Sequence, residues 1–124
     1  CQALRGEPLT VYNDGSRTRS FCFVSDMAEG LCRLLLADQV MPVNLGNPHE
    51  LTILELARLI VRLADSRSPI SFVVPRDERT KDDPQTRQPD IGLARAHLEW
   101  EPEVSLEKGL STTIAWFRGE LGLA

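Results

Sequence analysis

The sequence predicts a small α/β domain with a few short strands and about four helices. Short β-branched runs bounded by turn residues alternate with longer stretches of helical periodicity. The composition, with 42% hydrophobic and 26% charged residues, is that of an ordinary globular protein. A length of 124 residues allows one domain with a modest core.

Short strands are expected at residues 9–12, 42–45 and 70–74, where β-branched and other apolar residues lie between turns. The first of these ends in Asn13-Asp14-Gly15 and the second in Gly46-Asn47-Pro48. Another short apolar run, residues 21–24, leads into the first long helix.

Two helices begin with the spacing of a capping box, in which a small polar residue is followed by Glu three positions later. Asp26 and Glu29 have this spacing, and so do Thr52 and Glu55. Each start precedes an apolar stripe of helical period. The stripes consist of Met27, Leu31, Leu34 and Leu35 in the first helix, and of Ile53, Ala57, Ile60, Val61 and Ala64 in the second.

Two further helices are expected near the C-terminus. Pro89 suits the first turn of a helix that continues to about Leu98. A last helix begins at about Leu106, with Ile114 and Phe117 on its apolar face between Leu110 and Leu121. Trp100 and Trp116 are expected to be core aromatics of this region.

The net charge of −4 is spread along the chain, which argues against a general nucleic-acid or membrane surface. No apolar run approaches the roughly 18 residues of a membrane span. Cys1, Cys22 and Cys32 are odd in number and lack metal-ligand spacing, which favours free thiols in a reducing compartment. A cytoplasmic location is expected, although an upstream membrane anchor is an alternative.

Two polar segments carry arginines among turn residues. Arg17 and Arg19 follow the glycine turn, and Arg87 lies in the string DPQTRQPD. Arginines from separate loops suit a doubly charged ligand such as a diphosphate, because guanidinium binds phosphate bidentately. The alternative is solvated arginine, or an ion pair of Arg87 with one of the neighbouring aspartates.

Other polar residues give no chemical pattern of their own. Asp82 with Asp83, and Asp77 with Glu78, are adjacent carboxylates without a supporting histidine, and solvated charge is expected for them. His49 and His97 stand far apart and are expected at the surface. Asp90 suits a helix start. No metal site and no catalytic residue are therefore expected in this chain.

The strings GEPLTVY, DGSRTRSFCFVSD, PVNLGNP, LTILELA, DDPQTRQPDI and WEP point to a family. They resemble the C-terminal portion of extended short-chain dehydrogenase/reductases acting on nucleotide sugars, the NAD-dependent epimerase/dehydratase family. Within it, the string DDPQTRQPDI is similar to the subfamily of UDP-glucuronate decarboxylases. The other strings are shared with dTDP-glucose dehydratases and UDP-glucose epimerases, which remain alternatives, as does a non-catalytic binding module.

The resemblance implies that residues 1–124 form the C-terminal, nucleotide-sugar-binding portion of a homodimeric NAD-dependent enzyme and lack most of the Rossmann sheet. NAD and the catalytic residues would belong to an N-terminal half that precedes this chain, so the chain alone is expected to be inactive. In the family, NAD oxidises the sugar at C4, the β-keto acid loses carbon dioxide, and the hydride returns. The residues expected to bind the UDP-sugar are Pro8, Leu9, Thr10, Val11, Tyr12, Arg19, Phe23 and Arg87.

Three positions depart from the family pattern. Asn13 and Glu99 stand where glycine is usual. The turn at Asn13 is expected to survive, because Asn adopts the left-handed region more readily than most residues. Glu99 is expected at a helix C-cap, where a left-handed backbone would cost about 1 kcal/mol. Phe23 replaces a tyrosine, which removes a hydroxyl group near the predicted substrate loop.

Overall fold

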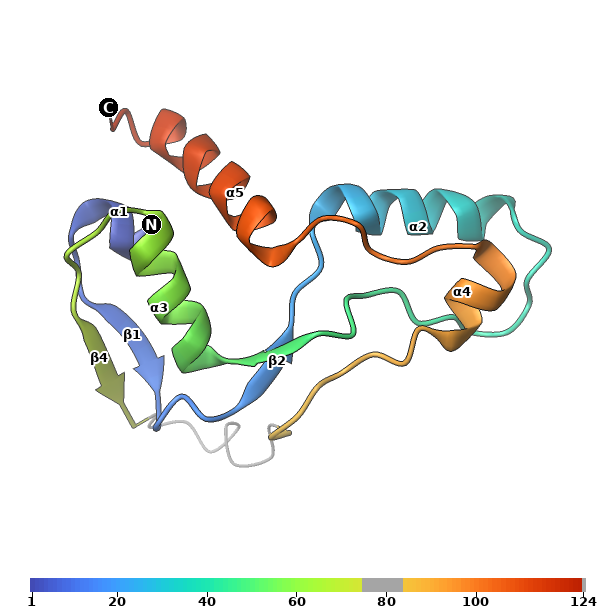
Figure 1. Cartoon of the computed structure of the whole chain (residues 1–124), viewed down its shortest axis with the longest axis horizontal. Coiled ribbons are helices and arrows are strands. Elements are labelled where there is room, and N and C mark those ends of the chain that lie inside the picture. The colour runs from blue at the N-terminus through green and yellow to red at the C-terminus, as the bar shows by residue number, and fades with distance from the viewer. Residues whose placement is uncertain (75–83, 124) are drawn as a thin grey trace.

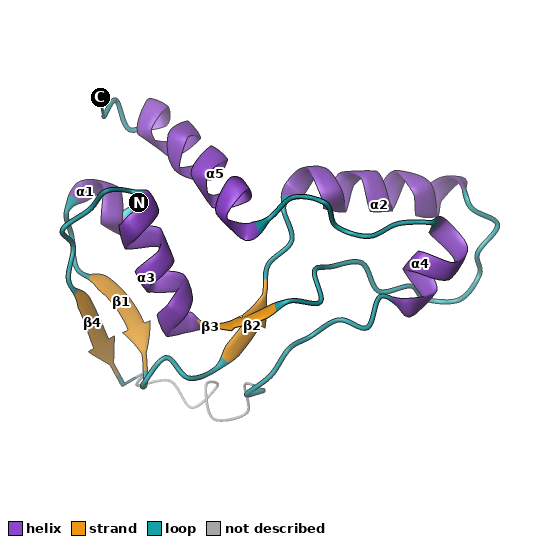
Figure 2. Cartoon of the chain, in the orientation of Figure 1, coloured by secondary structure: helices purple, strands orange, loops and turns teal. Residues whose placement is uncertain are grey.

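The structure, a computed structural model, describes residues 1–74 and 84–123. Its elements are α1 (Gln2–Arg5), β1 (Leu9–Tyr12), β2 (Thr18–Ser20), α2 (Val24–Leu36), β3 (Glu50–Thr52), α3 (Ile53–Leu63), β4 (Ile70–Val73), α4 (Gly92–Leu98) and α5 (Leu106–Glu120). The predicted α/β class is confirmed (Figure 2). The expected strands at residues 9–12 and 70–74 and the helix from Leu106 are also present.

The strands form two separate two-stranded sheets, which lie among the helices (Figure 1). β1 pairs with β4 in parallel, with Leu9 opposite Ile70, and β2 pairs with β3 antiparallel, with Arg19 opposite Leu51. Helix α3 packs on β1 and on α5, whereas α2 packs on α4 at the other end of the molecule.

Two separate groups of buried residues match these two ends. The first is Ala3, Leu9, Val11, Ala57, Ala64 and Ile114, and the second is Ile91, Ala94, Leu98 and Trp100. The predicted capping box of α3 is formed, with the Glu55 N–H donating to the Thr52 hydroxyl at 3.1 Å. The backbone is left-handed at Asn13 (φ 54°), where the expected turn is present, and at Glu99 (φ 49°), the C-cap of α4.

The predicted capping box of α2 is wrong. The helix begins at Val24 with Phe23 as its N-cap, and Asp26 is buried inside the first turn. Its carboxylate accepts the backbone N–H of Val104 at 2.9 Å, and its carbonyl accepts the indole N–H of Trp100 at 3.0 Å. Asp26 thus joins α2 to the segment between α4 and α5 rather than capping its own helix.

Several further expectations are corrected. Residues 42–45 form no strand, because no described segment lies beside them in a backbone ladder; the Asn44 side chain instead donates to the Asp90 carbonyl at 3.2 Å. Helix α4 begins at Gly92, three residues after Pro89, and the Gly92 N–H donates to the Asp90 carboxylate at 2.8 Å, as a helix-start carboxylate would require.

Three apolar residues that were expected to be buried are exposed. Leu31 and Leu35 on α2 are exposed by 54% and 83%, and Trp116 on α5 by 60%, so the expected apolar stripe of α2 is only partly covered and Trp116 is not a core residue. Trp100, which is 2% exposed, is a core residue as expected. None of the described helices is both long enough and apolar enough to cross a bilayer.

Candidate functional site

The two arginine-bearing segments lie side by side. The segment at residues 84–87 runs along the edge of β2 that does not pair with β3. The Thr18 N–H donates to the Gln85 carbonyl at 2.9 Å, and the Ser20 hydroxyl donates to the Arg87 carbonyl at 3.3 Å. Two loops far apart in the sequence are thereby brought to one edge, as a site for a doubly charged ligand would need.

Arg87 lines a cavity of about 590 Å³. The wall is formed by the end of β2, the start of α2, the turn before β3 and the segment that follows Arg87. Its residues are Ser20, Phe21, Cys22, Met27, Leu45, Gly46, Asn47, Arg87, Gln88 and Pro89. This wall combines a guanidinium and two amides with apolar side chains, a mixture typical of small-molecule sites.

Arg19 is part-buried and makes contacts to backbone carbonyls. Its Nη1 donates to the carbonyl of Thr18 at 2.6 Å and to that of Pro84 at 3.0 Å. Arg19 does not line the cavity that contains Arg87. The structure therefore brings the segments of the two arginines together while placing their side chains in different surroundings.

The five predicted residues in and just before β1 differ in exposure. The side chains of Leu9 and Val11 are buried at 7% and 1% exposure, so only their backbone atoms can line a ligand site. Pro8, Thr10 and Tyr12 are exposed. Thr10 and Tyr12 alternate with the buried positions and therefore share the other face of β1.

Phe23 lies against helix α5. A Cβ at Gly109 would meet the Phe23 ring at 2.9 Å, so the absence of a side chain at Gly109 permits this close packing. Phe23 lines a smaller hollow of about 150 Å³ with Leu106, Leu110 and neighbouring residues, apart from Arg87.

Cys22 borders both hollows. Partial burial raises the pKa of its thiol, and the carboxylate of Asp26 raises that pKa further. All three cysteines are free, as predicted. A protonated, half-buried thiol packs as a small apolar group rather than acting as a nucleophile.

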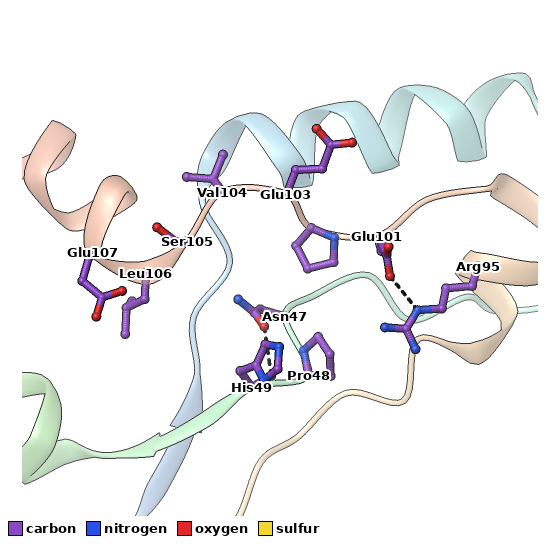
Figure 3. A pocket seen from close by; sticks show the side chains of 11 residues that line it. Asn47, Pro48, His49, Arg95, Glu101, Glu103, Val104, Ser105, Leu106 and Glu107 are labelled. Carbon is purple, nitrogen blue, oxygen red and sulfur yellow. Dashed lines mark hydrogen bonds and ion pairs between the residues drawn. The ribbon is translucent and has the colours of Figure 1, made fainter.

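A third cavity, of about 510 Å³, lies where the segment after α4 passes the turn at residues 47–49 (Figure 3). His49 lines it, and the backbone N–H of His49 donates to the Asn47 side-chain oxygen at 2.9 Å. Arg95 pairs there with Glu101 at 3.0 Å, and both side chains are more than half exposed. An exposed ion pair of this kind contributes little to stability.

The junction between β3 and α3 differs from a dinucleotide-binding turn. The junction between β3 and α3 is direct, and the Glu55 carboxylate accepts the Thr52 N–H at 2.7 Å at the helix N-terminus. A pyrophosphate there would meet this carboxylate instead of free amides and glycines. Within residues 1–74 and 84–123, no group of His, Cys, Asp and Glu is placed to hold a metal ion, and residues 77, 78, 82 and 83 lie outside the described part.

Sequence reasoning did not identify Ser20, Asn47 or Gln88 as members of the site. The turn signal at Gly46-Asn47-Pro48 was visible, but nothing local indicated that this turn faces Arg87. The Gln88 side chain donates to the Pro48 carbonyl at 2.7 Å, a contact between residues 40 positions apart that only the tertiary fold establishes.

Known proteins resemble the chain in sequence. The sequence model of the NAD dependent epimerase/dehydratase family matches residues 1–46. UDP-glucuronic acid decarboxylase 1 of Danio rerio is 53% identical over 97% of this chain and 28% of the relative. UDP-glucuronic acid decarboxylase 2 of Arabidopsis thaliana is 52% identical over 94% of this chain and 25% of the relative. The chain thus spans between a quarter and a third of the length of these two relatives.

Solved structures resemble the chain in fold. A UDP-glucose 4-epimerase of Thermotoga maritima, determined with UDP-glucose, superposes with a TM-score of 0.89 and 28% identity over 97% of this chain and 38% of that one. An epimerase of Methanothermobacter thermautotrophicus gives 0.87 and 31% over 97% of this chain and 36% of that one. The chain therefore matches the NAD-dependent epimerase/dehydratase family in sequence and in fold, with UDP-glucuronic acid decarboxylases among its relatives.

Proposed function

We propose that this chain is the UDP-sugar-binding part of an NAD-dependent UDP-glucuronate decarboxylase, which forms UDP-xylose and carbon dioxide. The observation that carries the proposal is the alignment of the Arg87 segment with β2 at a cavity lined by Arg87. The similarity to decarboxylases over nearly the whole chain supports the choice of substrate.

Arg87 is the residue we assign to the diphosphate. Its guanidinium can form bidentate hydrogen bonds with phosphate oxygens, and the Asn47 and Gln88 side chains in the same wall can donate further ones. We assign Arg19 to the same region, in agreement with the family resemblance. Phe23 lines the neighbouring hollow and not the cavity of Arg87. It would influence sugar binding indirectly, by positioning its chain neighbours Phe21 and Cys22, which line both hollows.

The edge of β1 that does not pair with β4 suits a uracil ring. The N–H groups of Leu9 and Asn13 donate toward β4, to the carbonyls of Pro69 and Val73. By alternation, the Thr10 carbonyl and the Tyr12 N–H face the opposite edge. Uracil presents a carbonyl oxygen beside an N–H donor, which complements this acceptor and donor, and the exposed Tyr12 ring can stack on the base.

In this proposal the chain binds and orients the substrate. The NAD that supplies the redox chemistry, and the residues that act on C4 and the carboxylate, belong to a part of the enzyme outside this chain. The parent is proposed to be a cytoplasmic homodimer, which light scattering and cell fractionation would test.

The test uses the whole protein. Incubation with UDP-glucuronate should release carbon dioxide and yield UDP-xylose, whereas UDP-glucose and dTDP-glucose should remain unconverted. Arg87→Ala should weaken UDP binding by roughly 1.5–3 kcal/mol, measured by calorimetry, because a charged hydrogen bond of about that strength is lost. Arg67→Ala, an exposed arginine after α3, is the control and should bind UDP normally. Normal affinity in the Arg87 variant would contradict the diphosphate assignment, and epimer formation without carbon dioxide would contradict the decarboxylase assignment.

A further inference from the structure

Arg87 sits in a stretch of chain that has no regular secondary structure of its own. Residues 84–90 are held against the rest of the molecule by individual hydrogen bonds rather than by a continuous ladder. One of these bonds is at Arg87 itself, whose carbonyl accepts the Ser20 hydroxyl at 3.3 Å, and others lie at either end of the stretch. The direction in which Arg87 faces depends on these bonds together, and we call residues 84–90 the arginine strap.

The downstream end of the arginine strap is tied to the turn before β3. Gln88 donates to the Pro48 carbonyl at 2.7 Å, and Asn44 donates to the Asp90 carbonyl at 3.2 Å. In both bonds a neutral side-chain amide donates to a backbone carbonyl.

The upstream end is tied by a charged group. Nη1 of Arg19 donates to the Pro84 carbonyl at 3.0 Å and lies 3.5 Å from that of Gln85, while it also bonds the Thr18 carbonyl at 2.6 Å. The guanidinium thus bridges the backbone of β2 and the backbone of the strap. The neighbouring bond from the Thr18 N–H to the Gln85 carbonyl, at 2.9 Å, holds the same point.

A guanidinium suits this bridge better than an ammonium would. Its planar fork presents several donors in fixed directions and can contact carbonyls on two segments at once. Charged hydrogen bonds are stronger than neutral ones, so Arg19 is the strongest of the described ties on the strap.

We propose that Arg19 is a positioning residue that fixes the arginine strap through the Pro84–Gln85 backbone and thereby holds Arg87 toward the diphosphate. This inference rests on the proposed function, since it names how the UDP site is set up. In this arrangement Arg19 supports ligand binding by holding the strap in place, and not by an independent contact of its own with the ligand.

The first experiment needs no ligand. In the whole protein, exchange of the Thr18 amide hydrogen is measured by NMR and corrected for sequence-dependent intrinsic rates. Arg19→Ala should accelerate this exchange about tenfold or more, because the Gln85 acceptor is released. Arg19→Lys keeps the charge and most of the side chain and serves as the variant least prone to misfolding; it should accelerate exchange as well. The control Arg67→Ala should leave the rate unchanged. Wild-type rates in both Arg19 variants would overturn the proposal.

The second experiment is a double-mutant cycle on binding of UDP and of uridine. Arg19→Ala and Arg87→Ala should each weaken UDP binding about tenfold or more and leave uridine binding intact, whereas general damage to the fold would weaken both. The double variant should bind UDP no more weakly than Arg87→Ala alone. Additive losses would mean that Arg19 contacts the ligand independently, and would overturn the proposal. If the wild-type protein bound no UDP, the proposed function would fail, and the Thr18 exchange rates would still decide whether Arg19 fixes the strap.

Discussion

The carboxylate of Asp26 accepts the backbone N–H of Val104 at 2.9 Å, although the two residues are 78 positions apart. Asp26 is only 8% exposed, and it lies in the first turn of α2, where the helix dipole favours a negative charge. This contact fixes the path of the chain from α4 to α5 across the start of α2.

Asp26→Ala is expected to lower the free energy of unfolding by about 1–3 kcal/mol, because the Val104 N–H loses its acceptor in a part-buried site. Asp26→Asn retains an acceptor and should cost less. Chemical denaturation measures both. Asp38→Ala, at an exposed position beyond α2, is the control and should change stability little; an equal loss in this variant would contradict the assignment.

Gly30 and Gly119 are two helical glycines with different surroundings. A Cβ at Gly30 would lie 2.9 Å from Trp100 and 3.2 Å from Leu45, whereas a Cβ at Gly119 has no neighbour within 4 Å. Gly30→Ala should destabilise the protein by about 1–3 kcal/mol through overpacking. Gly119→Ala should instead stabilise it by up to about 1 kcal/mol through helix propensity. Thermal melts that shifted in the same direction for both variants would disprove this contrast.

Glu99 occupies the left-handed C-cap of α4, a conformation that glycine adopts without strain. Glu99→Gly should therefore raise the free energy of unfolding by about 1 kcal/mol. The carbonyl of residue 99 accepts a hydrogen bond from Nη1 of Arg33 at 2.6 Å. The variant should keep this bond, because the substitution leaves the backbone carbonyl in place. Glu103→Gly, at an exposed residue whose φ is not positive, gains no such relief, so the two variants separate backbone strain from loss of a carboxylate.

Hydrogen bonds from Thr52 lower the pKa of Glu55 below its ordinary value. A carboxyl group with a lowered folded-state pKa stabilises the fold above its unfolded pKa of about 4.3, and this stabilisation is lost as pH falls through the lowered value. Glu55→Gln should therefore make stability fall less steeply below about pH 4.3, as measured by denaturation at a series of pH values. Thr52→Ala should do the same, and should also cost about 1 kcal/mol at neutral pH, whereas Thr52→Ser keeps the cap. An unchanged slope in Glu55→Gln would refute the linkage.

Cys22 and Cys32 should differ in reactivity toward iodoacetamide. Burial and Asp26 raise the pKa of the Cys22 thiol, whereas Cys32 is exposed on α2. At pH 8, mass spectrometry should find Cys32 modified well before Cys22, because only the thiolate reacts. In denaturant the two cysteines should be modified at equal rates, which serves as the control. Equal modification rates in the folded protein would contradict the burial of Cys22.

Features set by neighbouring residues could be predicted from the sequence. The Thr52–Glu55 capping box forms because both partners lie within one helical turn, and Asn13 and Glu99 adopt the left-handed backbone that turns and C-caps require. The box proposed for Asp26 fails because a distant amide, that of Val104, uses the carboxylate instead.

Features that depend on a neighbouring segment could not be predicted. An apolar stripe indicates which face of α2 can be buried but not whether another element covers it, and Leu35 is 83% exposed. In the site, the sequence indicated two arginine segments, and the structure places these segments side by side. It gave no sign that the Arg19 guanidinium would bind the Pro84 carbonyl, because that contact joins residues 65 positions apart.

The parallel pairing of β1 with β4 has a consequence for how this chain reaches its native state. Leu9 meets Ile70 only after roughly 60 intervening residues have been brought into a closed loop, which is entropically costly before any contact compensates. Helix α3 can form early from its own capping signals, but the ladder that completes the first group of buried residues must wait for this closure. Refolding is therefore expected to be slow for a chain of this length, with β4 docking near the end.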